Sequence, residues 1–343
     1  MVSIKRLLSC IVLLASLSGL SGCLNVDAGF DNPERAEIKF TPMTDAQTKA
    51  PLSSFPNGRT MQVAARYYPD GTIATGSDVN YFDATTFTYS TSNGYASSSG
   101  NYVRYWPLDN TGYLNFLAYS TALSVSSVTW NANYSLGVSF VTPNNSTTQD
   151  DILVGSKYQA TRTASGGNQI TFKHAQALIA FEAKSTVAYD ASANRGITIT
   201  GITMNAAAHQ GTCSVSRSWN SASGTLTIGW STSTSNNLNS ITVPGSNTAR
   251  NLTASYQSLG TGIMMPQQTN NGQYVIISYT LHNGKDAGGN NIDIAMNYKY
   301  TLDGTGWSPS NRYLYQFYFQ QYAITVTTSV SDWTAGGTTS PSI

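Results

Sequence analysis

The sequence predicts an all-β protein built from antiparallel β-sandwiches. Short runs of alternating apolar and polar residues predict strands, and polar stretches rich in Gly, Asn and Ser separate these runs. The chain is also rich in tyrosine, with 21 residues, and in glycine, with 29, as turn-rich β-proteins are. No apolar stripe with helical spacing is visible after residue 23. Strands that recur roughly every ten to fifteen residues are typical of a β-sandwich.

The individual strands follow from the alternation. The clearest runs cover residues 170–174, 226–230, 275–281, 292–300, 313–319 and 324–330. In the run 292–300, Ile292, Ile294 and Met296 share one face, which predicts a half-buried strand. The preceding stretch, Asp286 to Asp293, offers oxygen ligands, but their spacing does not match a calcium loop. Its Gly288-Gly289 pair suits positive φ and predicts a hairpin turn.

The first residues have the parts of a secretory signal peptide. A positive start, a short apolar run and a small-residue exit predict a signal peptide over residues 1–22. The segment that ends at Cys23, Leu-Ser-Gly-Cys, resembles the lipobox of bacterial lipoproteins, in which the cysteine thiol is acylated. The resemblance implies lipidation at Cys23 and a stable lipid anchor. An ordinary signal peptide with a chance cysteine is the alternative.

The composition argues against several classes of protein. Lysine plus arginine number 18, aspartate plus glutamate number 17, and only 10% of residues are charged, so we expect no nucleic-acid partner. With Cys10 in the signal peptide and Cys23 lipidated, Cys213 has no partner for an intramolecular disulfide. The exported chain must therefore be held together by its core.

No catalytic or metal-binding motif is visible. Adjacent Asp150 and Asp151 point to opposite faces of an extended chain, so their spacing does not make an acid–base pair. His209 and Cys213 do not complete a zinc site, and we expect a surface histidine and a buried cysteine. His174 lies in a strand and is expected to be structural. We therefore predict no enzyme activity, no metal site and no cofactor.

Several segments resemble, in the same order, the recurring blocks of the fimbrillin family, the subunits of type V pili. They are ERAEIKFTP, RTMQVAARYY, NYVRYWPLDNTGYLNFLAYS, DDILVGSKY, ITFKHAQALIAFEAK and WSPSNRYLYQFYFQQYAITVTTSVSDW. The resemblance implies two transthyretin-like antiparallel β-sandwich domains in tandem. The polar stretch from Thr161 to Gln169 is the expected boundary. The chain then divides into a lipidated propeptide with the first strand, an N-terminal domain and a C-terminal domain, at residues 23–49, 50–163 and 168–343.

The resemblance also implies a mode of assembly. In this family an exported lipoprotein loses its N-terminal segment, including its first strand, and the C-terminal segment of another subunit fills the open groove. Contacts of this head-to-tail kind build filaments. The implied partners are other pilus subunits, identical or paralogous, and the outer membrane, with a host glycan or protein as a further candidate. The implied location is the outer membrane and the cell-surface fimbrium.

Particular residues match these roles. Ile38 and Phe40 lie on the apolar face of a short strand that fits the displaced strand. The family's processing site follows that strand and is usually an arginine, whereas the matching stretch here offers Lys49-Ala50. Cutting at Arg35 would leave the strand in place, and Arg59 begins the next strand. Lys49 is equally compatible with an ordinary solvated linker.

The donor strand is expected near the C-terminus. Ile324, Val326 and Val330 alternate as a donor's side chains do, with Trp333 as a terminal anchor. The same residues also fit a permanent strand of the chain's own second domain. Residues 334–343 contain few apolar side chains and form a poor donor, which suits a tip, anchor or accessory subunit.

Two functions remain open at this point. The first is a structural pilus subunit that supports adhesion. The alternative is a surface-anchored lipoprotein that does not polymerise and binds a glycan on an exposed tryptophan, Trp230 or Trp307. Aromatic residues that alternate along a strand also fill the core of a sandwich, so core packing is the competing interpretation of both tryptophans.

Overall fold

A computed structural model gives the fold of the chain. Every regular element in the described part is a β-strand, and no helix there is long and apolar enough to cross a membrane. The structure describes residues 35–44, 55–69, 79–98, 103–108, 112–121, 125–131, 135–141, 149–163, 166–208, 210–217, 226–232, 238–269, 272–302, 304, 306–320 and 323–333. The predicted lipidation and processing positions, Cys23, Lys49 and Ala50, lie outside these residues, as does His209, the expected surface histidine.

The chain divides into two compact units, Met1–Ala36 and Glu37–Ile343. Only Arg35 and Ala36 of the first unit are described, and the architecture that follows is that of the second.

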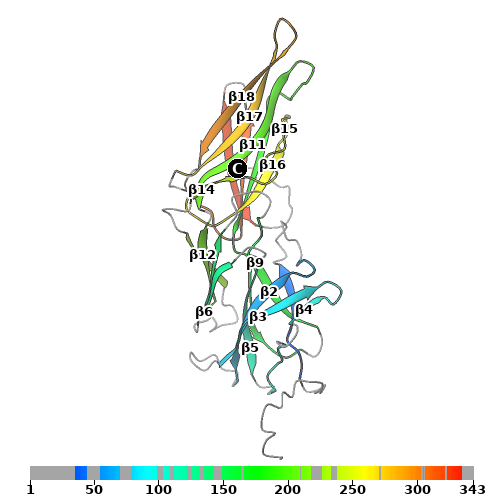
Figure 1. The fold of residues 1–343 in the computed structure, drawn as a ribbon, viewed down its shortest axis with the longest axis vertical. Helices are drawn as coiled ribbons and strands as arrows, with labels where there is room; N and C mark the ends of the chain where they lie inside the picture. Colours follow the sequence, from blue (N-terminus) through cyan, green and yellow to red (C-terminus); the bar gives the residue numbers. More distant parts are fainter. Residues whose placement is uncertain are drawn as a thin grey trace, which may run out of the picture. The chain divides into compact units, whose positions relative to one another are not determined.

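Seven strands of the second unit close into a barrel in the order β1-β4-β3-β2-β5-β8-β9 (Figure 1). They are β1 (Lys39–Thr44), β2 (Thr60–Tyr68), β3 (Val79–Ser90), β4 (Tyr95–Ser97), β5 (Tyr113–Ser120), β8 (Leu153–Ala160) and β9 (Asn168–His174). The β1–β9 pair is parallel, and the other neighbouring pairs are antiparallel. Since β1 pairs with β4 on one side and β9 on the other, this short strand closes the barrel.

Two hairpins form a separate four-stranded sheet in the order β13-β12-β7-β6. They are β6 (Val125–Asn131), β7 (Ser135–Val141), β12 (Gln210–Arg217) and β13 (Leu226–Thr232). Val138, Cys213 and Val215 of this sheet share one buried cluster with Leu117 and Val154 of the barrel strands. The hairpin sheet therefore covers part of the barrel.

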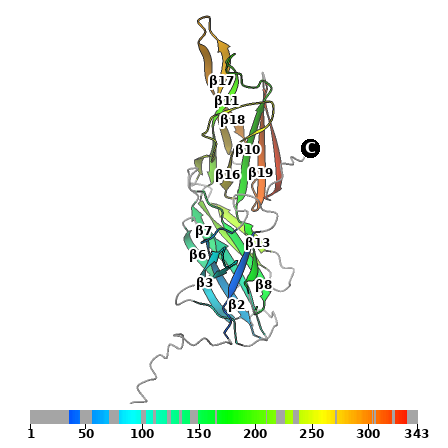
Figure 2. The same ribbon diagram turned by 90° about the vertical axis from the view of Figure 1, so that its right-hand side faces the viewer.

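The remaining strands form a two-layered sandwich, whose sheets Figure 2 shows as separate layers. One sheet has the order β16-β10-β19-β20 and the other β14-β11-β17-β18, with β15 also paired to β11. Their bounds are β10 (Ala177–Ser185), β11 (Arg195–Ala208), β14 (Leu238–Thr242), β15 (Arg250–Asn251), β16 (Gln257–Met264), β17 (Tyr274–Lys285), β18 (Asn291–Thr301), β19 (Asn311–Phe319) and β20 (Ile324–Asp332).

The predicted alternation explains most of the sandwich core. Tyr313, Tyr315, Phe317 and Phe319 of β19 are all buried, because residues two apart on a strand point to the same face. The predicted hairpin before β18 is confirmed, since the Asp286 carboxylate accepts hydrogen bonds from the backbone of the turn. One prediction is wrong. The run 292–300 is a strand, but it is not half-buried, because every residue of β18 except Tyr298 and Tyr300 is exposed.

The strand pairings cross the domain boundary expected between residues 163 and 168. β9 follows that boundary in sequence, yet it pairs with β8 and β1 of the barrel. The β12–β13 hairpin also lies in the expected second domain, and it pairs with β7. A domain boundary between residues 163 and 168 therefore stays a prediction. In the sheet topology, residues 161–167 connect β8 to β9, which are neighbouring strands of one barrel.

Candidate functional site

The slot that holds β1 is the candidate functional site. Phe40 lies opposite Ala96 of antiparallel β4 and opposite Asn168 of parallel β9. Just before the strand, the backbone N–H of Ile38 donates to the carbonyl of Arg104 at 2.7 Å. The predicted alternation is present, because Ile38, Phe40 and Pro42 are buried between less buried neighbours. The N-terminal strand is thus a full member of the fold, and other strands lie on both sides of it.

The Phe40 side chain fills the centre of the barrel. Its ring meets the rings of Phe87 and Phe116 edge-on, each at a centroid distance of 4.8 Å. All three side chains are fully buried. Edge-to-face contacts add about 0.5–1.5 kcal/mol per pair to the free energy of burial. Removal of β1 would therefore uncover an apolar surface as well as two strand edges.

The backbone before β9 approaches β1 closely at Gly167. A Cβ atom on Gly167 would lie 2.5 Å from the carbonyl carbon of Phe40 and 2.6 Å from the amide nitrogen of Thr41. Real side chains do not tolerate such distances to backbone atoms. The slot is thus shaped for a strand whose backbone passes directly beside a glycine.

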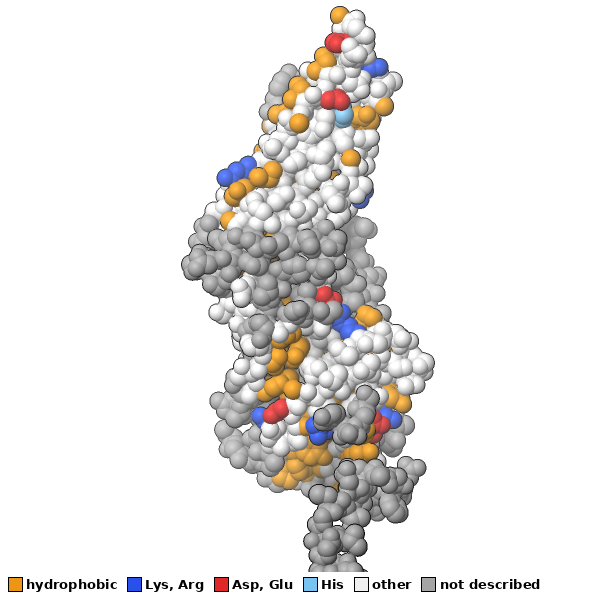
Figure 3. Space-filling model, viewed as in Figure 1, with side chains coloured by type: hydrophobic (Ala, Val, Ile, Leu, Met, Phe, Trp, Pro, Cys, Tyr) orange, Lys and Arg blue, Asp and Glu red, His pale blue; other side chains and the backbone are white. Residues whose placement is uncertain are grey.

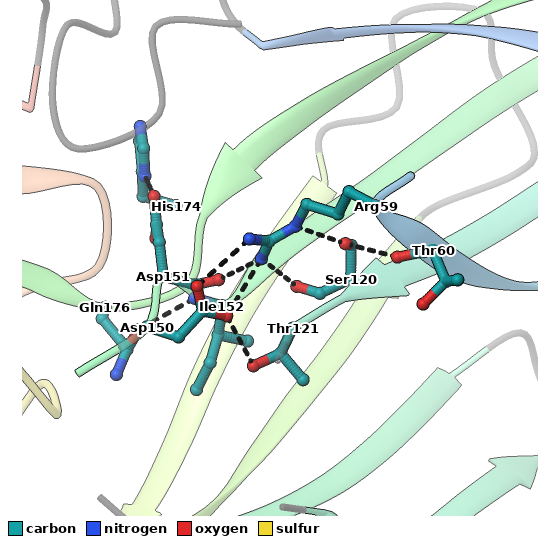
Figure 4. A network of polar contacts seen from close by, with 9 residues as sticks. All are labelled: Arg59, Thr60, Ser120, Thr121, Asp150, Asp151, Ile152, His174 and Gln176. Atoms are coloured by element: carbon teal, nitrogen blue, oxygen red, sulfur yellow. Dashed lines mark hydrogen bonds and ion pairs between the residues drawn. The ribbon is translucent and has the colours of Figure 1, made fainter. Parts of the chain in front are cut away.

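Residues that follow the predicted processing site are anchored independently of β1. Phe55 is buried against the rings of Tyr89 and Phe172. Arg59 donates hydrogen bonds to both carboxylate oxygens of Asp150, at 3.1 Å each, and to the Asp151 carbonyl at 2.7 Å (Figure 4). A bidentate guanidinium–carboxylate pair is a strong and directional contact. The start of β2 is therefore fixed to the segment that precedes β8.

Asp150 and Asp151 point to different partners, as their adjacent positions predicted. Asp150 binds Arg59, whereas an Asp151 carboxylate oxygen lies 2.5 Å from Nδ1 of His174 (Figure 4). In this contact an imidazole nitrogen faces a carboxyl oxygen, and both side chains are buried. Burial raises the pKa of the Asp151 carboxyl, and the contact with His174 acts in the opposite direction.

The His174 ring also holds the end of the last described strand. It stacks on the Trp333 ring at a centroid distance of 4.0 Å, and both side chains are 1% exposed. The backbone N–H of Trp333 donates to the carbonyl of Ser310, and the Ser310 hydroxyl donates to the carbonyl of His174. These contacts give His174 a structural role and attach the end of β20 to the end of β9.

The predicted donor residues all lie in or directly after β20. This strand pairs with β19 from Ile324, opposite Phe319, to Asp332, opposite Asn311. Val330 is 48% exposed, whereas Trp333 is buried. In this structure the stretch is an edge strand of the chain's own sandwich.

Neither tryptophan proposed for sugar stacking lies on an open face. Trp307 is 3% exposed, and its indole N–H donates to the hydroxyl of Tyr315. Trp230 is half-buried, and its indole N–H donates to the carbonyl of Ala175.

Cys213 is buried as expected, and burial raises the pKa of its thiol to about 12. Within the described residues, no group of His, Cys, Asp and Glu could hold a metal ion.

Sequence reasoning missed two features of this site. It did not identify the parallel pairing of β1 with β9, and it did not identify the Arg59 network. The presence of an arginine and two aspartates at the edges of predicted strands was a signal for the network, but one sequence does not say which charges meet. The apolar face that the sequence predicted for this strand, Ile38 and Phe40, is fully buried.

Comparisons with known proteins agree with this architecture. A family profile described as Fimbrillin-like matches residues 48–333. A fimbrial protein from Bacteroides vulgatus is similar in structure, with a TM-score of 0.56 and 17% identity over 88% of this chain and 100% of that one. Proteins assigned to cell adhesion from Bacteroides ovatus and Bacteroides uniformis give TM-scores of 0.52 and 0.51 at 11% and 14% identity. These two alignments cover 88% and 89% of this chain, and 99% and 100% of the other chains. None of the curated proteins matches the chain.

Proposed function

This chain belongs to the fimbrillin-like family, and on that premise we propose that it is a structural subunit of a cell-surface fimbrium that receives a strand from another subunit in place of β1. The position of β1 is the observation that carries the proposal. A strand at the start of the chain, paired on both sides and with a buried apolar face, can be replaced by an equivalent strand from another chain. We propose no catalytic step for the protein itself.

The proposed route starts with export as a lipoprotein acylated at Cys23, followed by cleavage between Lys49 and Ala50. Lys49 lies between β1 and the first anchored residue of the body, Phe55. A cut there separates β1 from the rest of the chain. The new N-terminal segment stays held on the fold by Phe55 and Arg59. Arg59 is a poor cleavage site, because its side chain is only 11% exposed and is paired with Asp150.

Loss of β1 would leave a slot with defined chemistry. Residues Asn168 to Phe172 of β9 would lose their five partners in β1, and Ala96 and Ser97 of β4 would lose theirs. Unpaired strand edges next to the exposed rings of Phe87 and Phe116 favour capture of an apolar, extended segment. We propose that the incoming strand places large apolar side chains at the positions that Ile38 and Phe40 occupy.

We propose that β20 is a permanent strand of this chain and not its donor. Donation of Ile324, Val326, Val330 and Trp333 would break all nine register pairs with β19 and the stack on His174. A subunit that accepts a strand but keeps its own last strand ends a filament. A copy of this chain that keeps β20 has no strand to donate, so the proposed partner in the exchange is a paralogous subunit. The same proposal includes two tandem transthyretin-like sandwiches and an outer-membrane lipid anchor. It also includes a contribution to adhesion, with a host glycan or protein as ligand.

The test is to cleave the purified full chain with a lysine-specific protease and to mix it with its sister pilus subunits. We expect a species that begins at Ala50 to form oligomers that resist detergent, while the uncut chain stays monomeric under the same conditions. Lys49→Gln is the matched control, because it should prevent both the cut and the assembly. An Ala50 species that stays monomeric with every subunit would contradict the proposal.

A further inference from the structure

The β17–β18 hairpin carries an unusual exposed apolar surface. Ile292, Ile294 and Met296 are 37%, 42% and 40% exposed, and they alternate along one face of β18. This is the face that packs on the opposite sheet further along the strand, where the rings of Tyr298 and Tyr300 contact Phe317. In both ribbon views the hairpin extends past the ends of β19 and β20 (Figures 1 and 2). The apolar face is exposed where the opposite sheet ends.

The outer edge of this hairpin is also unpaired in the described part of the chain. β18 is the last strand of its sheet, and it pairs only with β17. From Asp293 to Thr301 the register is regular, without a bulge, and the strand contains no proline. Edge strands are usually protected by bulges, prolines or inward charges, because a long regular edge pairs with other chains. Figure 3 shows apolar side chains along this part of the surface.

The charges on β18 make the edge complementary to itself. Asp293 and Lys299 are equally distant from Met296, and both lie on the face opposite the apolar residues. The Asp293 carboxylate is held by hydrogen bonds from Asn194 and His282, and the Lys299 ammonium lies 3.9 Å from the centroid of the Tyr274 ring. Two copies paired antiparallel about Met296 therefore place each Asp293 opposite a Lys299.

The same register matches the apolar face. Met296 meets Met296, and Ile294 of one copy meets Tyr298 of the other. Cross-strand pairs of aromatic with β-branched residues, and of opposite charges, are favourable in antiparallel sheets. A shift by two residues would separate the charged pairs. Charge and apolar pattern thus select one register among the antiparallel ones.

We propose that the β18 edge is an interface with a second copy of this chain, formed by two-fold antiparallel pairing centred on Met296. The contact is independent of the slot of β1 and of strand exchange there. It joins subunits side by side, whereas replacement of β1 joins them head to tail. On a cell surface, such a contact would link neighbouring subunits laterally.

Disulfide trapping in the purified full chain tests the interface. Met296→Cys should form a covalent dimer on mild oxidation, because the two thiols face each other. Val330→Cys is the matched control, since Val330 is 48% exposed on the other edge strand, β20, and it should form no dimer beyond that of the unsubstituted chain with its natural cysteines. Ile294→Cys and Tyr298→Cys should cross-link when mixed and not when oxidised separately.

A charge exchange gives a second readout that does not need cysteine. Lys299→Glu places two acidic residues opposite each other at both ends of the contact and should weaken dimerisation about tenfold in sedimentation equilibrium. Adding Asp293→Lys to this variant should restore the dimer. The proposal fails if Met296→Cys forms no more dimer than Val330→Cys. It also fails if Ile294→Cys alone cross-links as fast as the mixture.

Discussion

Trp333 stacks on His174 with ring planes 15° apart, which joins the end of β20 to the end of β9. Both rings are almost fully buried, and Trp333 belongs to a small apolar cluster with Leu178 and Ile263. β9 is also the strand that pairs with β1. The last described residue of the sandwich therefore lies at the far end of the strand that forms one wall of the β1 slot.

Truncation of this ring tests whether β20 is permanent. Trp333→Ala should lower the free energy of unfolding by about 3–5 kcal/mol, because it removes a large buried side chain from a packed site. Val330→Ala on the same strand should change it by less than about 0.5 kcal/mol, because Val330 is largely exposed. Urea unfolding of the two variants gives the comparison. Equal, small effects would mean that the end of β20 is not part of the stable fold.

Phe40 tests whether β1 is replaceable. In the uncut chain Phe40→Ala should cost about 3–5 kcal/mol of unfolding free energy, because the ring is at the centre of the barrel. After cleavage and strand exchange the same substitution should have no effect on oligomer stability, because the incoming strand occupies the slot. Met43→Ala, at a 40% exposed position of β1, is the control. An equal cost of Phe40→Ala in the assembled form would show that β1 stays in place.

Arg59 tests the anchor that holds the start of β2. Arg59→Ala removes the guanidinium hydrogen bonds to the Asp150 carboxylate and to the Asp151 carbonyl and should cost about 2–3 kcal/mol. Arg59→Lys should recover only part of this, because an ammonium does not form the bidentate pair. Arg162→Ala, at an exposed arginine, should be nearly neutral. Thermal unfolding followed by circular dichroism ranks the three. If Arg59→Ala were as stable as the unsubstituted chain, these contacts would not anchor the start of β2.

Cys213 should be inert in the folded chain. Burial raises its thiol pKa to about 12, so at pH 8 only about one thiol in ten thousand is the reactive thiolate. We expect iodoacetamide to leave the Cys213 peptide unmodified in native protein and to modify it fully in urea, as mass spectrometry of the digested chain would show. Rapid native labelling at pH 8 would mean that the cluster around Cys213 opens readily.

Local patterns predicted the strands because one face of most strands is buried. The spacing of aromatic residues in 313–319 was sufficient to identify β19 and its buried face. The same spacing in 292–300 identified β18 but not its exposure. Burial of that strand depends on how far the opposite sheet extends, and residues distant in sequence decide this.

Long-range pairing and charge contacts were not readable from one sequence. Thr41 and Gly167 meet across the β1–β9 pair although they are 126 residues apart. The sequence also predicted that the side chains of Asp150 and Asp151 point to opposite faces. It did not predict that Asp150 pairs with Arg59 and that Asp151 contacts His174. Complementary charges have many candidate partners in a chain, and only the fold selects among them.

The N-terminus of the mature chain tests the central proposal most directly. Intact mass and N-terminal sequencing should be carried out separately on chains purified from membranes and from filaments sheared off the cell surface. The account predicts a chain that begins at Ala50 in the sheared filaments, with Cys23 present only in the membrane precursor. A chain that begins at acylated Cys23 in every fraction, with β1 still attached, would contradict it.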